Sequence, residues 1–333
     1  MVRHDVSLKP FNTFGIDQRA EEMLVLKDVD ALKILEERSE PPALVLGGGS
    51  NILLTRDVPG LTVHNDLRGI EVVRETGDHV WITAMAGEVW HDVVLYAIER
   101  GWGGIENLSL IPGRMGAAPM QNIGAYGVEL EQVFERLEAW DLRTHRTEMF
   151  GRSACAFGYR ESIFKTTQRG RYIILSVTLR LAKRPTYHLD YGALKRTLAD
   201  MGVQELSVRA VSDAVIRIRR SKLPDPAEIG NAGSFFKNPV IDRPRYDDLL
   251  DDFPDMPSYP VEDGVKVPAG WLIDRAGWKG RRFGAYGVHA HQALVLVNHG
   301  GAAGSDIYAL SETIRQDVLN TYGIALEREV NIV

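Results

Sequence analysis

The chain has 333 residues, with 44% hydrophobic and 25% charged side chains and a formal net charge of −6, and this length allows two or three domains with a sizeable buried core. Mild acidity gives no electrostatic basis for binding nucleic acid or an acidic membrane surface, so neither partner is expected, although a local cluster of donors can still bind a small anion. Cys155 is the only cysteine, which excludes an internal disulfide and a multi-cysteine metal site and favours a reducing compartment.

The first residues of the chain carry no targeting pattern. Residues 1–10 mix charged and isolated apolar side chains and lack the apolar core of a signal peptide. No stretch approaches the roughly 20 apolar residues that a membrane-spanning helix needs. We therefore expect a cytoplasmic protein without membrane insertion.

The next elements predict a small α/β unit. Apolar residues at helical spacing follow Asp28 and predict a helix over 31–35. The short apolar run 43–46 predicts a buried strand. This strand leads directly into the glycine-rich segment 47–51.

The middle of the chain predicts short strands around one helix. Residues 80–84 read as a strand, and a helix begins near His91 and stops at Gly101, a plausible glycine C-cap. The stretch 101–127 is rich in glycine and predicts a loop. Strands resume near Leu137 and near Tyr172.

The last third of the chain predicts two further helices. One covers 208–218 and stops before two prolines, and the other is capped by Ser305 and ended by Gly323. The segment 251–260 reads as a surface connection, and 325–333 reads as a final strand. The fold class is α+β, and the expected domains are 1–66 with the C-terminal strand 326–333, then 67–206, and then 207–325.

The glycine-rich segment 47–51 is not a standard nucleotide motif. A G-x-G-x-x-G pattern needs glycine where Ile52 stands, and the chain has no Gly-Lys pair for a Walker A loop, so a Rossmann dehydrogenase and a P-loop enzyme are disfavoured. Consecutive glycines still let backbone N–H groups approach a pyrophosphate, with Ser50 and Asn51 as added donors. A tight turn after a strand is the alternative. The candidate cofactor contacts here are Gly47, Gly48, Gly49, Ser50 and Asn51.

The segment 111–127 favours a ligand over a plain connection. Its small residues let a large flat ligand lie close to the backbone, and its amides offer the donors and acceptors that an isoalloxazine edge requires. Long loops without secondary structure are commonly functional or disordered. The candidate cofactor contacts are Pro112, Gly113, Gly116, Ala117, Gln121, Asn122, Gly124, Ala125, Tyr126 and Gly127.

Several segments, in this order, resemble the signature segments of the UDP-N-acetylenolpyruvoylglucosamine reductase family: 12–15, 47–51, 111–127, 157–165, 230–239, 269–274 and 288–298. The resemblance covers nearly the whole chain. It implies a vanillyl-alcohol-oxidase-like fold, with non-covalent FAD between the first two domains and the third covering the active site. It further implies that NADPH is the hydride donor for reducing UDP-N-acetylglucosamine enolpyruvate to UDP-N-acetylmuramate in bacterial peptidoglycan synthesis. A monomer is expected.

The resemblance implies three catalytic residues: Arg160, Ser234 and Glu329. Arg160 offers a planar fork that suits a carboxylate, against the alternative of a weak surface ion pair with Glu161. Serine is a poor acid and protonates only a strong base such as a carbanion, whereas a local turn is the commoner fate of a loop serine. Alternation places Glu329 away from the apolar face of the last strand, and only the resemblance selects it over Glu327.

The resemblance also implies four substrate-binding residues: Tyr191, Lys222, Asn238 and Gln292. The neighbouring Arg217, Arg219 and Arg220 are explained by the macrodipole at a helix C-terminus, and the acidic run 247–252 by a solvated helix face. His289 and His291 lack a third ligand nearby, so no metal is expected. Arg114-Met115 is bulkier than the pair often found in the family, and Asn331 stands where many relatives have arginine.

Two other classes of function stay open. One is a flavin oxidase that uses oxygen and another substrate on the same scaffold. The other is a non-catalytic protein that binds a nucleotide sugar. The match through the three catalytic positions favours the reductase.

Overall fold

The computed structural model describes residues 1–190 and 193–333, which form two compact units. Unit 1 comprises 1–6, 20–48 and 58–221, and unit 2 comprises 7–19, 49–57 and 222–333. Unit 1 holds most of the first two expected domains. Unit 2 holds most of the third, together with the C-terminal strand. The division into three domains stays a prediction.

The smaller sheet of unit 1 has the strand order β1-β2-β5-β3. Strand β5 pairs in parallel with both β2 and β3. The helix expected after Asp28 is confirmed as two short helical turns, begun by the Asp28 carboxylate, which accepts a hydrogen bond from Asp30 N at 2.8 Å. The expected burial of 43–46 is confirmed only at Leu46; Ala43 and Val45 are exposed and Leu44 is partly exposed, because β3 is an edge strand. The elements are β1 (Val2–Ser7), β2 (Arg19–Leu26), η2 (Val29–Leu32), α1 (Lys33–Glu36), β3 (Leu44–Leu46) and β5 (Val58–Asn65).

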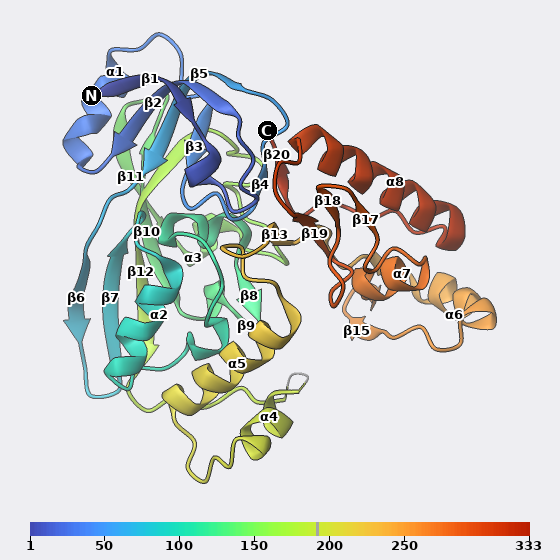
Figure 1. Ribbon diagram of the computed structural model, residues 1–333. Helices are drawn as coiled ribbons and strands as arrows, with labels where there is room; N and C mark the ends of the chain where they lie inside the picture. Colours follow the sequence, from blue (N-terminus) through green and yellow to red (C-terminus); the bar gives the residue numbers. More distant parts are fainter. Residues whose placement is uncertain (191–192) are drawn as a thin grey trace. The chain divides into compact units, whose positions relative to one another are not determined.

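The larger sheet of unit 1 is antiparallel, with the order β11-β10-β12-β7-β6. Helix α2 (Trp90–Glu99) lies along one face (Figure 1), where its apolar side chains share a core with those of β7 and β12. Gly101 follows with a φ of 72°, which confirms the predicted helix stop. The strands are β6 (Ile70–Glu75), β7 (His79–Met85), β10 (Phe134–Asp141), β11 (Arg146–Gly151) and β12 (Tyr172–Ala182).

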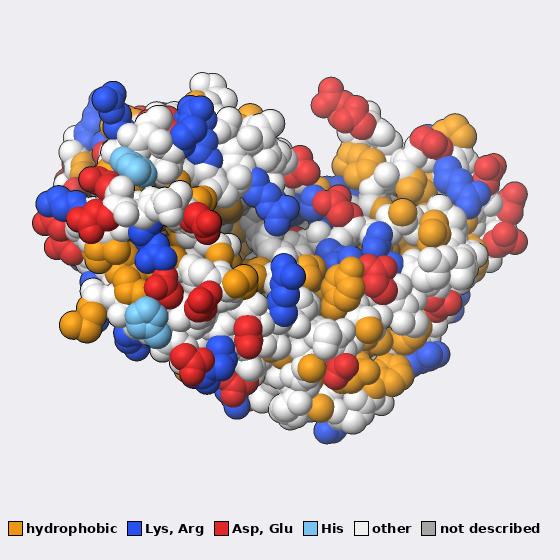
Figure 2. Space-filling model, turned by 90° about the horizontal axis from the view of Figure 1, so that it is seen from above, with side chains coloured by type: hydrophobic (Ala, Val, Ile, Leu, Met, Phe, Trp, Pro, Cys, Tyr) orange, Lys and Arg blue, Asp and Glu red, His pale blue; other side chains and the backbone are white. Residues whose placement is uncertain are grey.

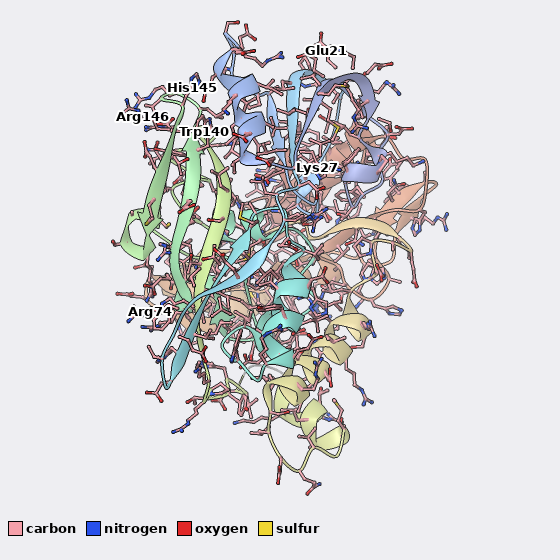
Figure 3. All side chains as sticks on the ribbon, turned by 90° about the vertical axis from the view of Figure 1, so that its left-hand side faces the viewer. Glu21, Lys27, Arg74, Trp140, His145 and Arg146 are labelled. Carbon is pink, nitrogen blue, oxygen red and sulfur yellow. The ribbon has the colours of Figure 1, made fainter. Side chains whose placement is uncertain are left out.

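Strand β12 joins the cores of the two sheets. Its residues Ile173 and Leu175 pack with the smaller sheet, while other β12 residues pack under α2. At the same end of the larger sheet, Trp140 and His145 stack with ring centroids 6.4 Å apart (Figure 3). Side chains of β12 therefore contribute to both cores of unit 1, although the strand is hydrogen-bonded only within the larger sheet.

The glycine-rich stretch 101–127 contains short helical turns and a small hairpin rather than a plain loop. Helix α5 (Val208–Lys222) confirms the predicted helical pattern and packs with α4 (Leu194–Asp200) in unit 1. The remaining elements of this unit are η3 (Glu106–Leu108), η4 (Met115–Ala117), η5 (Pro119–Gln121), β8 (Gly124–Ala125), β9 (Val128–Glu129), η6 (Leu130–Gln132) and α3 (Arg152–Cys155).

Unit 2 contains an antiparallel sheet of order β13-β19-β18-β17, a smaller sheet of order β14-β16-β15, and the parallel pair β20-β4. The last expected strand is confirmed only at β20, because the residues before it are irregular. The strands are β4 (Ile52–Leu53), β13 (Gly230–Ser234), β14 (Val240–Ile241), β15 (Tyr259–Val261), β16 (Gly264–Lys266), β17 (Arg282–Phe283), β18 (Tyr286–Val288), β19 (Val295–Asn298) and β20 (Asn331–Ile332).

The helices of unit 2 are η1 (Lys9–Phe11), α6 (Arg243–Asp252), α7 (Ala269–Arg275) and α8 (Gly304–Tyr322). The exposed acidic residues of α6 confirm the solvated helix face. The predicted cap at Ser305 is wrong. The helix starts one residue earlier, at Gly304, where a Cβ would lie 1.8 Å from Leu54 O. Gly323 ends α8 with a φ of 65°, as predicted.

Within residues 1–190 and 193–333, no helix is long and apolar enough to cross a membrane. The same residues contain no group of three potential ligands that would hold a metal ion. Basic and acidic side chains are interspersed over most of the face in Figure 2.

Candidate active site

The glycine-rich loop after β3 begins in unit 1. A Cβ on Gly47 would lie 3.4 Å from the stem of Arg114, and a Cβ on Gly48 would lie 3.2 Å from Gly113 Cα. Both glycines remain partly exposed. The two glycine-rich segments therefore lie in close main-chain contact, with the stem of the Arg114 side chain packed against Gly47 and Gly48.

Gly49 continues this loop in unit 2 and must be glycine. Its φ is +58°, and a Cβ would lie 2.0 Å from Phe11 O. Thr13 N donates to Gly49 O at 3.1 Å, and the Asn12 amide makes three hydrogen bonds to the backbone of its own loop. The segment 12–15 therefore stabilises the glycine-rich loop through its hydrogen bond to Gly49.

Backbone hydrogen bonds fix the start of the second glycine-rich segment. Trp90 N donates to Gly113 O at 3.0 Å, and Gly116 N donates to Ala86 O at 2.9 Å. A Cβ on Gly116 would lie 2.7 Å from the Ala86 Cβ. This glycine is required for packing between the loop and the turn that follows β7. The other predicted contacts on this segment are Pro112, Ala117 in η4, Gln121 in η5, Ala125 in β8 and Gly127.

Asn122 is a buried support of this segment. Its Nδ2 donates to Glu129 Oε2 at 3.0 Å and to Gly158 O at 3.2 Å, and its Oδ1 accepts from Glu131 N at 3.0 Å. These bonds hold the loop against the turn that carries Arg160. A direct contact between Asn122 and a cofactor stays a prediction.

Arg160 lies in a tight turn in which Gly158 and Glu161 exchange backbone hydrogen bonds. Its φ is 58°, an uncommon value for a residue with a side chain. Arg160 Nη2 donates to Gly124 O at 2.6 Å, and a Cβ on Gly124 would lie 2.9 Å from Nη1. The absence of a side chain at Gly124 allows the guanidinium to lie against the loop.

Ser234 and Glu329 come together in unit 2 although 95 positions separate them in the sequence. Glu329 N donates to Phe235 O at 2.9 Å, so the residue after Ser234 is bonded directly to Glu329. Of the three apolar residues expected on one strand face, Leu326 and Val330 are buried, at 1% and 3% exposure, whereas Ile332 is partly exposed and 326–330 is irregular. The two predicted catalytic residues thus lie on adjacent segments of one unit.

Two predicted substrate residues converge at the start of α7. Asn238 Oδ1 accepts from Ala269 N at 3.0 Å. A Cβ on Gly270 would lie 3.2 Å from Gln292 Oε1. Lys222 is exposed at the end of α5, and Tyr191 lies outside the described residues.

Two basic side chains that the structure buries, in part or fully, were not among the site residues predicted from the sequence. Arg219 was assigned to the helix terminus, but it is partly buried beside Tyr126, and this burial lowers the pKa of its guanidinium. Its position four residues after Val215, on the apolar face of the helix, was the available signal. Lys237 is also buried, and its Nζ lies 2.6 Å from the Glu327 carboxylate.

The residues of both glycine-rich segments fit a bound dinucleotide. Gly47, Gly48 and Ser50 are partly exposed, and a Cβ on Gly48 would lie 3.2 Å from Gly113 Cα, so the two main chains approach each other closely. Glycine-rich loops can offer backbone N–H groups to a ligand. Such groups bind phosphate without a charged side chain.

Comparisons with known proteins agree with this reading. Residues 29–147 match the model of an FAD binding domain, and residues 225–333 match that of the UDP-N-acetylenolpyruvoylglucosamine reductase C-terminal domain. UDP-N-acetylenolpyruvoylglucosamine reductase from Pseudomonas aeruginosa is 52% identical over 331 residues, covering 98% of this chain and 97% of the relative. The reductase from Amoebophilus asiaticus is 50% identical over 336 residues, covering 100% and 99%. The crystal structure of the Thermus caldophilus reductase has a TM-score of 0.69 at 24% identity, covering 100% and 99%.

Proposed function

Because the chain belongs to the UDP-N-acetylenolpyruvoylglucosamine reductase family, we propose that it reduces UDP-N-acetylglucosamine enolpyruvate to UDP-N-acetylmuramate, with NADPH as hydride donor. It is an FAD-containing oxidoreductase with a vanillyl-alcohol-oxidase-like fold. The observation that carries the proposal is the similarity over the full length to relatives of that name. The product is a precursor of peptidoglycan, so we place the reaction in the bacterial cytoplasm, and we propose a monomer.

The two glycine-rich segments would hold the cofactor. Backbone N–H groups of 47–51 suit the diphosphate, and the small residues of 113–127, most of them partly exposed, suit a flat ring system. Bound FAD supplies the hydride-transfer chemistry between NADPH and the enolpyruvyl double bond. The task left to the protein is to orient the substrate, to stabilise negative charge and to deliver a proton.

Arg160 and Glu329 would stabilise the negative charge that develops beside the substrate carboxylate. The Arg160 guanidinium is already oriented by its hydrogen bond to Gly124 O, so little reorganisation is needed when it meets an anion. A planar guanidinium also matches a carboxylate with two parallel hydrogen bonds. Glu329 would contribute as a protonated acid or through a shared hydrogen bond.

Ser234 would deliver the proton to the carbon next to the carboxylate. A serine hydroxyl transfers its proton only to a strong base, and a carbanion meets this requirement. The backbone pairing of Phe235 with Glu329 supports a common role for the two segments. Lys222, Asn238, Gln292 and Tyr191 would bind the nucleotide diphosphate and the sugar.

An anaerobic visible spectrum tests the function directly. The purified protein should be yellow, should bleach when NADPH is added, and should regain its colour when the enolpyruvyl UDP-sugar is added. Bleaching without return would keep the flavin but overturn the substrate. Fast reoxidation by air alone would point to an oxidase, and a colourless protein that cannot be reconstituted with FAD would refute the proposal.

A further inference from the structure

Asn331 links the glycine-rich loop to the segment that carries Glu329. Its backbone N donates to Asn51 O at 3.1 Å, and its side-chain Nδ2 donates to the same oxygen at 3.0 Å. Asn51 Nδ2 in turn donates to Glu329 O at 3.2 Å. Within unit 2, Asn51 is thus hydrogen-bonded to two residues of the C-terminal segment, Asn331 and Glu329.

We propose that Asn331 is a positioning residue for the reduction: its side chain holds Asn51, and Asn51 holds the backbone of Glu329. The inference rests on the proposed function, because it assigns to Glu329 a part in that reaction.

The side chain of Asn331 is not needed for strand pairing. β20 pairs with β4 through the backbone, in the register Asn331 with Ile52. Further along, Val333 N donates to Leu53 O at 2.9 Å. A variant that lacks only the Asn331 amide keeps this ladder, so its fold should survive.

The amide instead acts on the position of Glu329. The Glu329 backbone is held on one side by Phe235 O, through its own N–H, and on the other by the Asn51 side chain. The Asn51–Glu329 bond of 3.2 Å is at the long end of the hydrogen-bond range, so a small displacement of Asn51 breaks it. Catalytic groups must be held to within about 0.5 Å of the productive geometry. In a variant without the Asn331 amide, the backbone N–H of residue 331 still bonds Asn51 O, so the loss should loosen the hold on Asn51 and shift the Glu329 segment rather than release it.

The two half-reactions separate this effect from general damage. Asn331→Ala, fully loaded with FAD, should be reduced by NADPH at a rate within about twofold of the wild type. Its reoxidation by the enolpyruvyl UDP-sugar should be slower by roughly 2- to 10-fold, the range for one lost hydrogen bond. Asn320→Ala is the matched control in unit 2, because Asn320 is an exposed asparagine on α8 that accepts a hydrogen bond from Gln316.

A double-mutant cycle with Asn51→Ala tests whether Asn331 affects Glu329 through Asn51. If Asn331 acts through Asn51, the double variant should be reoxidised no more slowly than Asn51→Ala alone, whereas a general structural role gives additive losses. Additive losses, or reoxidation of Asn331→Ala at the rate of Asn320→Ala, would overturn the inference.

Two controls keep the experiment decisive. If Asn331→Ala does not fold by circular dichroism, Asn331→Asp replaces it, since this variant keeps the side-chain size but lacks the Nδ2 donor. A wild-type protein that bleaches with NADPH but does not recover with the UDP-sugar contradicts the proposed function rather than the role of Asn331.

Discussion

The substitution Gly124→Ala should displace the Arg160 guanidinium, although Arg160 itself is unchanged. The new Cβ would lie 2.9 Å from Arg160 Nη1, 2.8 Å from Glu129 Cγ and 3.1 Å from Val128 O. The two side chains can move, whereas the backbone oxygen can give way only slightly. The guanidinium is therefore expected to leave its place against the loop and to lose its 2.6 Å hydrogen bond to Gly124 O.

The size of the effect follows from the lost bond and the displacement. A hydrogen bond from a charged group is worth about 1.5–3 kcal/mol, which corresponds to a rate factor of roughly 10 to 10². A displacement of about 1 Å in a catalytic group has a similar effect. Reoxidation by the enolpyruvyl UDP-sugar should slow by this factor, and reduction by NADPH should stay within about threefold of the wild-type rate.

Stopped-flow absorbance of the FAD-loaded protein measures both rates. Gly151→Ala is the matched control, because Gly151 has a φ of −80° and a Cβ there would meet no atom within 4 Å. FAD content is measured for each variant, since Gly124 also belongs to the predicted cofactor loop. Equal slowing of the two half-reactions, or unchanged reoxidation, would refute the reasoning.

Four other predictions use different measurements. Ser234→Ala should leave flavin reduction by NADPH intact and slow reoxidation by the substrate roughly 10²- to 10⁴-fold; equal slowing of both steps would remove Ser234 from the proton-donor role. Lys222→Ala should weaken UDP-sugar binding in calorimetry, and an unchanged dissociation constant would count against its assignment. The hydrogen bonds from Arg171 hold the pKa of the Asp141 carboxyl well below its usual range, so this group stabilises the fold above about pH 4, and the stability is lost as the pH falls through the lowered pKa. Urea unfolding should show Asp141→Asn less stable than the wild type at pH 7, with the difference shrinking in acid. Burial raises the pKa of the Cys155 thiol to about 12, so a thiol reagent at pH 8 should label the unfolded protein but not the native one.

Periodicity in the sequence was sufficient for the longer elements. The helices α5 and α8 were predicted from apolar residues at helical spacing, and a glycine marked the expected end of α2 and of α8. These signals are local, because one turn of a helix and its cap lie within a few residues. The sequence predicted a strand over 325–333, of which β20 is part, but nothing local identified its partner β4, which has two residues and lies far away in the sequence.

Sequence by itself also placed the candidate site residues, largely through the order of the glycine-rich and polar segments and their resemblance to one family. It supplied the chemistry of an arginine, a serine and a glutamate but not their surroundings. Arg219 lies near the C-terminal end of α5, as the macrodipole explanation requires, but its partial burial was not predicted, because only tertiary packing decides burial.

Only the tertiary structure explains why glycine is required at particular positions and which groups the side-chain amides contact. Gly49 must be glycine because of Phe11 O, and Gly124 because of the Arg160 guanidinium. Asn331 reaches Asn51 across 280 positions of sequence. Such contacts depend on close packing between segments that are far apart along the chain. No local pattern encodes them, whereas helices, caps and turn residues are determined by neighbours within a few positions.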